Sequence, residues 1–181
     1  MARRDAAAWR RLHESNRAWL KPWEATVPHG SRQAPMTFRR LVRSLRQQAR
    51  EGRAMPFVIC YEGQMIGQLT VAGVTWGSAR WAQIGYWIAQ SHAGRGLTTL
   101  AVAMVVDHCF GPVGLHRIEI AIRPENSASL RVVEKLGFDR IGLSPAYLHI
   151  DGGWRDHLLF AMTVEQAGGS LAARVVSSAD V

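Results

Sequence analysis

The sequence contains 181 residues, which is enough for one domain with a sizeable hydrophobic core. Hydrophobic residues make up 48% of it and seven residues are tryptophan, so the chain is not globally disordered. No apolar run reaches the roughly 18 residues that a membrane span needs, and the net charge of +8 fits a nucleic acid, an acidic surface or a polyanionic small molecule as partner. Cys60 and Cys109 lie in apolar runs, which predicts core thiols in the reducing cytoplasm and no metal site.

The first third of the chain is predicted to be helical. One helix runs from about Asp5 to Leu20 and ends at Pro22. A second helix lies within residues 36–52, where the apolar side chains recur at helical spacing (Phe38, Leu41, Val42 and Leu45). Much of the excess positive charge falls between Arg3 and Arg53, also at helical spacing. This pattern fits a solvated helix face and a binding patch equally well.

From residue 56 onward strands and helices alternate. The predicted elements are two strands in 56–74, a strand in 81–89, a helix in 97–110, a strand in 115–124, a helix between Asn126 and Gly137, and two strands in 139–163. The order ααβββαβαββ predicts a mixed α/β sheet in three layers. Residues 1–164 are expected to form this domain, and residues 165–181, rich in Ala, Gly and Ser, a flexible tail.

The stretch "SHAGRG", residues 91–96, joins a predicted strand to a predicted helix. Glycines at such a junction let backbone amides approach an anion at the positive end of the helix dipole. The amides that would point at a pyrophosphate belong to Gly94, Arg95, Gly96, Leu97, Thr98 and Thr99. A Walker loop is excluded because no Gly-Lys-Ser/Thr follows, and a Rossmann fingerprint because the third glycine is missing. The alternative is a purely structural turn.

A second candidate group opens the next helix, "NSASLRVVEKLGF". Asn126 is expected to cap this helix whatever its function. Because the helix follows a strand parallel to the previous one, Asn126 and Ser129 are also placed to face a ligand at the carboxyl ends of these strands.

Together these segments resemble the Gcn5-related N-acetyltransferase (GNAT) superfamily, whose junction Q/R-x-x-G-x-G/A binds the pyrophosphate of acetyl-CoA. Gly94 and Gly96 match this pattern, whereas Ser91 replaces its Gln or Arg. The helix at Asn126 is similar to the second signature of the RimJ/RimL branch, and "NRAWLKPWE" and "AYLHIDGGWRDHLLFAMT" are similar to the RimJ type. Family members usually begin with a strand before "RRDA", so we expect the GNAT fold here without its first edge strand.

The resemblance implies direct transfer of acetyl from acetyl-CoA, through a tetrahedral intermediate, to the N-terminal amine of a small-subunit ribosomal protein that starts with Ala or Ser. Backbone groups of Trp87, Ile88 and Ala89 would hold pantetheine, with an N–H near Trp87 or Ile88 stabilising the oxyanion. Ser129 would protonate the leaving thiolate, and Glu119 is a candidate base through a water relay, with Glu24 and His149 as alternatives. The expected acceptor-binding residues are Trp19, Trp23, Glu24 and Tyr147.

Two other functions stay open from the sequence. A small-molecule amine acetyltransferase, acting on an antibiotic or a polyamine, would share every cofactor residue and differ at the acceptor. A ribosome- or RNA-binding module with a vestigial acetyl-CoA site is the other alternative, because Ala146 stands where relatives place a carboxylate and the chain is basic. Ribosome association fits either class, and we expect a monomer or a homodimer.

Overall fold

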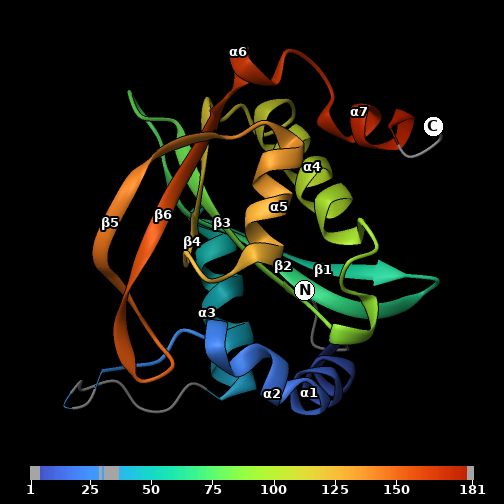
Figure 1. Ribbon diagram of the computed structural model, residues 1–181, viewed down its shortest axis with the longest axis vertical. Coiled ribbons are helices and arrows are strands. Elements are labelled where there is room, and N and C mark those ends of the chain that lie inside the picture. Colours follow the sequence, from blue (N-terminus) through green and yellow to red (C-terminus); the bar gives the residue numbers. More distant parts are fainter. Residues whose placement is uncertain (1–4, 29, 31–36, 179–181) are drawn as a thin grey trace.

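The computed structural model describes residues 5–28, 30 and 37–178 (Figure 1). The first part of the chain is helical, with α1 (Ala6–Ser15), α2 (Arg17–Leu20), the short 3-10 helix η2 (Lys21–Trp23) and α3 (Phe38–Arg50). The single helix predicted up to Leu20 is broken at Asn16, whose Nδ2 donates to the Leu12 carbonyl over 2.8 Å. Asn16 Oδ1 also accepts from the Gln90 N–H at 2.8 Å, which ties this break to a distant segment of the chain.

The six strands form one mixed sheet in the order β1-β2-β3-β4-β6-β5. Their bounds are β1 Ala54–Tyr61, β2 Gln64–Thr75, β3 Trp81–Ile88, β4 Arg117–Ile122, β5 Asp139–Ile150 and β6 Gly153–Thr163. Neighbours are antiparallel except β3 and β4, which are parallel and joined through the 3-10 helix η3 (Gln90–His92) and α4 (Leu97–Phe110). The predicted order of elements is confirmed, and within the described ranges no strand of the sheet precedes β1.

The core lies between the sheet and two helices, α4 and α5 (Ser127–Leu136), which cover one face, while α3 lies on the other (Figure 1). Side chains alternate along β4, so Ile118, Ile120 and Ile122 are buried in this core. Cys109 is buried as expected, but Cys60, near the end of β1, is exposed. No helix within the described ranges is both long enough and apolar enough to cross a membrane.

The structure differs from the expected flexible tail after residue 164. Two short helices follow β6, α6 (Val164–Ala167) and α7 (Leu171–Ser177), and α7 packs on α4. Leu171 is only 1% exposed. Asp107 of α4 accepts hydrogen bonds from the amides of Leu171 and Ala172 and from the Ser170 hydroxyl, at 2.7–3.0 Å. A carboxylate far away in sequence therefore satisfies the free amides at the start of α7.

Candidate active site

The parallel strands β3 and β4 separate along their length. They pair only from Trp81 to Gln83 on β3 and from Arg117 to Glu119 on β4, so β3 has no partner on this side beyond that point. The Ala89 N–H donates to the Ile66 carbonyl on β2 over 2.8 Å. Because backbone groups alternate in direction along a strand, the backbone of Trp87 also faces β2, whereas that of Ile88 faces the opening toward β4. The Ile88 N–H, and not the Trp87 N–H, is therefore the donor that faces the opening between β3 and β4. We call this opening the slot.

The glycine junction lies where the slot opens at the end of β3. Gly94 and Gly96 have φ values of +77° and +78°, a conformation that glycine adopts without strain, and no atom lies within 4 Å of a Cβ built on either residue. Gly96 is the N-cap of α4 and no side chain caps this helix. Among the described residues, no group accepts a hydrogen bond from the amides at positions 94–99. The positive end of a 14-residue helix is therefore open to an anion.

The start of α5 forms the opposite wall. Asn126 caps the helix as predicted, since its Oδ1 accepts from the Ser129 N–H at 3.1 Å. This cap places Ser129 in the first turn of α5, facing the junction across the slot. The two helix starts border a single cavity of about 330 Å³, which is lined at the junction by Gly94, Gly96, Leu97, Thr98 and Thr99.

The same cavity is bordered by α2 and η2. Trp19, Trp23, Trp87 and Ile88 line it, and Trp19 Nε1 donates to the Ile88 carbonyl over 3.1 Å. Arg123 lies beside Trp23, with Cζ 5.4 Å from the ring centroid, and its Nη1 donates to the Pro22 carbonyl at 2.7 Å. These contacts fix η2 against the end of β4 and make an aromatic wall at one end of the cavity.

Tyr86 is a site residue that the sequence interpretation missed. Its side chain lines the cavity, and its hydroxyl is buried with no hydrogen-bond partner among the described residues. Burial raises the pKa of Tyr86 to about 12, and the neighbouring Ser129 hydroxyl opposes this shift. The two hydroxyls are near neighbours, but their geometry is not that of a hydrogen bond. The alternation that buries Ile84 and Ile88 could have placed Tyr86 on this face.

Several predicted site residues lie outside the cavity lining. Glu119 is on the opposite face of β4 from the core, with Oε1 2.7 Å from Arg117 Nε, and belongs to the last β3–β4 pair at the closed end of the slot. Arg95 turns toward β1, where its guanidinium lies 4.9 Å from the centroid of the Tyr61 ring. Ala89 is buried, with its N–H engaged by β2 as described above.

The predicted acceptor residues Glu24 and Tyr147 also lie beside the cavity rather than in its lining. Glu24 Oε1 is 2.6 Å from Nε2 of His13, a histidine that the sequence interpretation did not single out. The Tyr147 hydroxyl accepts from Gln83 Nε2 at 2.9 Å. Ala146 has φ +47°, and its N–H donates to Asp156 Oδ1 at 2.8 Å, which places a carboxylate from β6 next to Ala146.

These features suit a pantetheine thioester with a diphosphate. Amide N–H groups without a partner at a helix start can donate hydrogen bonds to the diphosphate, and a strand with an unpaired edge offers backbone groups to an extended amide chain. In the described part of the chain, no three His, Cys, Asp or Glu side chains are grouped so that they could hold a metal ion. The fold and the slot define an acyl-CoA N-acyltransferase.

Comparison with known proteins agrees with this class. The sequence profile of the acetyltransferase (GNAT) domain matches residues 1–139, and the chain belongs to this family. It is 45% identical to Mycobacterium smegmatis RimJ, solved with a CoA disulfide, with a TM-score of 0.91 over 99% of this chain and 87% of that one. It is 32% identical to the [ribosomal protein uS5]-alanine N-acetyltransferase of Escherichia coli K12 over 163 residues, which is 88% of this chain and 84% of that protein.

A further relative matches only part of its own length. The probable N-acetyltransferase YjcK of Bacillus subtilis is 38% identical over 101 residues, and the match spans 56% of each chain. The family assignment makes the protein an acetyl-CoA-dependent N-acetyltransferase with a GNAT fold.

Proposed function

We propose that the protein acetylates the N-terminal α-amine of a ribosomal protein that begins with Ala or Ser, and that it does so in the cytoplasm. The observation that carries this proposal is the likeness to RimJ over 99% of the chain, which includes α2, η2, β5 and β6 around the acceptor end of the slot. The likeness to an enzyme named for the alanine of ribosomal protein uS5 supports the same acceptor chemistry. A small-subunit protein is the proposed substrate.

The proposed chemistry assigns a task to each part of the slot. Acetyl-CoA supplies an acetyl group that is already activated as a thioester. The amides at positions 94–99 hold its diphosphate, and the Ile88 N–H points to where negative charge develops on the acetyl oxygen. This donor is fixed before reaction, because its neighbouring carbonyl is bound by Trp19.

Two residues on opposite faces of the sheet, Ser129 and Glu119, are proposed to transfer the protons. Ser129 donates a proton on the core side. Tyr86, whose raised pKa keeps it protonated at neutral pH, is its neighbour, and we infer that the two hydroxyls form a hydrogen bond once the thioester is bound. An α-amine has a pKa near 8, so a modest base reached through water is sufficient to accept its proton. Glu119 at the closed end of the slot is the proposed base, with its carboxylate held in position by Arg117.

A peptide acetylation assay tests this function. Release of CoA is measured with peptides that begin with Ala or Ser, with the same peptides already N-acetylated, and with spermidine and an aminoglycoside. We expect turnover of the free Ala and Ser peptides only. Good turnover of the small amines without peptide turnover would reject the proposal in favour of a small-molecule acetyltransferase.

The role of Ser129 is tested with matched serine variants. We expect Ser129→Ala to bind CoA normally but to slow peptide acetylation at least tenfold, because one proton-transfer group is lost. Ser177→Ala on α7 removes a hydroxyl that, within the described ranges, bonds only to the Ala173 carbonyl, and it should keep full activity. Unchanged turnover in Ser129→Ala would remove Ser129 from the mechanism.

A further inference from the structure

We propose that the outer face of α3 binds the phosphate backbone of RNA. Four arginines of this helix, Arg39, Arg43, Arg46 and Arg50, occur at the spacing i, i+4, i+7 and i+11. At 100° per residue these positions fall within about 60° of one another around the helix axis, so they form one row along it. We call this row the α3 arginine stripe. The buried residues Val42 and Leu45 lie on a different side of the helix.

The stripe is unfavourable for the helix on its own. Like charges three or four residues apart on a helix repel each other, and residues 38–50 contain no acidic side chain to offset them. Arg39 and Arg40 stand in the first turn, where the helix dipole disfavours positive charge. Repulsion along a whole helix face means that a bound polyanion would stabilise this surface.

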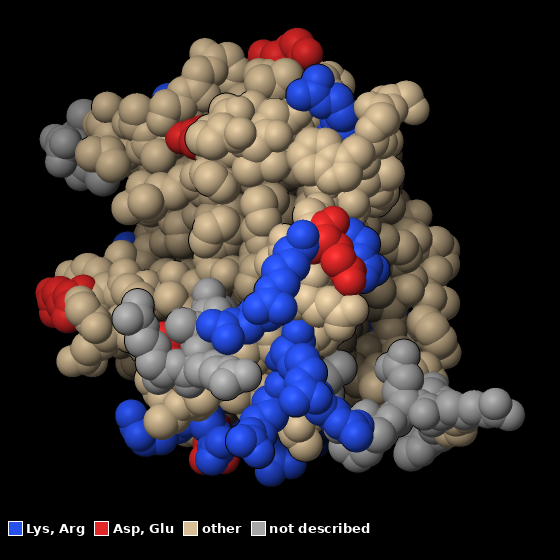
Figure 2. Space-filling model, turned by 180° about the vertical axis from the view of Figure 1, so that it is seen from behind, with Lys and Arg blue, Asp and Glu red and all other residues tan. Residues whose placement is uncertain are grey.

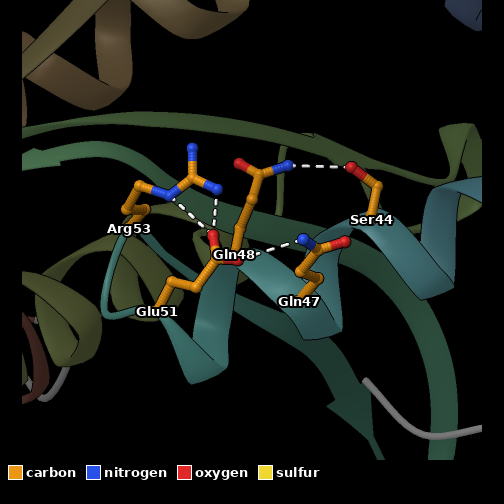
Figure 3. A network of polar contacts seen from close by, with 5 residues as sticks. All are labelled: Ser44, Gln47, Gln48, Glu51 and Arg53. Carbon is orange, nitrogen blue, oxygen red and sulfur yellow. Dashed lines mark hydrogen bonds and ion pairs between the residues drawn. The ribbon is translucent and has the colours of Figure 1, made fainter.

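Nearby polar groups do not neutralise the stripe. Glu51 is the acidic residue that follows α3, and its carboxylate binds Arg53 and accepts from Gln47 Nε2 at 3.0 Å (Figure 3). Hydrogen bonding to Arg53, and then to Gln47, lowers the pKa of Glu51. Gln48 instead donates to the Ser44 hydroxyl at 2.9 Å. None of the α3 arginines forms an ion pair with another residue of the described ranges.

The stripe is accessible and extended. Arg39, Arg43 and Arg50 are exposed and Arg46 is half-buried. Figure 2 shows a column of basic side chains on the side of the molecule where α3 lies. From Arg39 to Arg50 the stripe measures roughly 16 Å, with successive arginines about 4.5–6 Å apart along the axis. A row of regularly spaced guanidinium groups matches a polymer with one phosphate per unit, which arginine binds in a bidentate manner.

The choice of RNA over an acidic protein rests on the proposed function, because a ribosomal protein is presented next to ribosomal RNA. The binding surface itself is separate from the acetyl-transfer site, since no α3 residue lines the cavity at the glycine junction. The stripe would therefore raise the encounter rate with an RNA-bound substrate without taking part in the chemistry.

RNA binding is measured by fluorescence anisotropy with a labelled, mixed-sequence 20-nucleotide single-stranded RNA between 50 and 300 mM KCl. Four phosphate contacts predict a slope of about −3 in log affinity against log salt. The double variant Arg43→Gln/Arg46→Gln should halve this slope and weaken binding roughly 20- to 30-fold at 100 mM KCl. The control Arg140→Gln/Arg174→Gln removes the same charge from exposed positions on β5 and α7, and should change affinity less than threefold.

Each outcome decides the proposal. A loss of RNA affinity in the α3 variant alone, with CoA binding intact in both variants, supports it. Equal losses of RNA affinity in the two variants would overturn it, because RNA binding would then depend on net charge. Absence of RNA binding by the wild type at 50 mM KCl would also overturn the proposal. The proposal would also be overturned if polyglutamate displaced the labelled RNA as well as unlabelled RNA does, because the partner would then be an acidic protein. Acetylation of the free peptide is scored separately, so that a failure of the proposed function is distinguished from a failure of the stripe.

Discussion

Substituting Tyr86 by phenylalanine should separate stability from activity. The Tyr86 hydroxyl is buried without a hydrogen-bond partner among the described residues. Leaving a buried polar group unpaired costs about 1–3 kcal/mol, so removing this oxygen should raise the free energy of unfolding by about 1 kcal/mol. For a chain of this length, that gain corresponds to a rise in Tm of about 2–4 °C. Peptide acetylation should nevertheless slow about tenfold, because the Ser129 hydroxyl would lose the hydrogen bond that we propose it makes to Tyr86 once the thioester is bound.

The assay combines thermal unfolding with single-turnover acetylation of an Ala-starting peptide. Because Tyr86 acts through Ser129 in this account, the double variant Tyr86→Phe/Ser129→Ala should be no slower than Ser129→Ala alone. Tyr61→Phe is the matched control, since its hydroxyl binds Arg95 at the far end of β1 and not the cavity. A Tyr86→Phe variant that is less stable than wild type but fully active would refute the reasoning. So would a double variant whose acetylation rate falls by the product of the two single-variant effects.

Two further predictions concern packing and pH. Gly67→Ala should destabilise the sheet and abolish activity, because the added Cβ would lie 2.3 Å from the Trp87 carbonyl oxygen. The control Gly85→Ala, which has open space around the added Cβ on the same pair of strands, should fold normally. Equal melting temperatures of the two variants would contradict this prediction. Burial lowers the pKa of His157, so the unfolded chain takes up a proton at a higher pH than the folded one, and stability should fall as the pH drops below about 6.5. Urea unfolding should show that the free energy of unfolding changes less between pH 7.5 and pH 5.5 in His157→Gln than in wild type. An equal change in the two proteins would argue against His157 as the cause.

Local chemistry explains what could be predicted from the sequence. A junction that needs positive φ selects glycine, so Gly94 and Gly96 by themselves indicate where α4 begins. Asn126 likewise indicates the start of α5, because its side chain caps the helix that it precedes. Both features depend on residues within one turn of the chain, and these local signals together locate most of the cavity.

Features built from distant residues could not be predicted in the same way. The order in α7 depends on Asp107, which lies 63 residues before Ser170, so the Ala- and Ser-rich composition alone indicates a flexible tail. Glu119 could not be assigned to one face of the sheet, because the alternation along β4 does not say which face packs against α4 and α5. The pairing of Glu24 with His13 joins α1 to the extended residue that follows η2, which periodicity within one helix does not reveal.

The proposed acetyl transfer requires the amides at the start of α4 to hold the diphosphate of acetyl-CoA. Calorimetric titration with CoA of wild type, Gly96→Ala and Gly137→Ala tests this most directly, because both glycines have φ +78° and open space around the added Cβ. Each substitution should cost about 1 kcal/mol of stability, since an L residue is strained in this conformation. Only Gly96→Ala should lose CoA affinity, by about tenfold. Equal affinity in all three proteins, or no CoA binding by the wild type, would contradict the account.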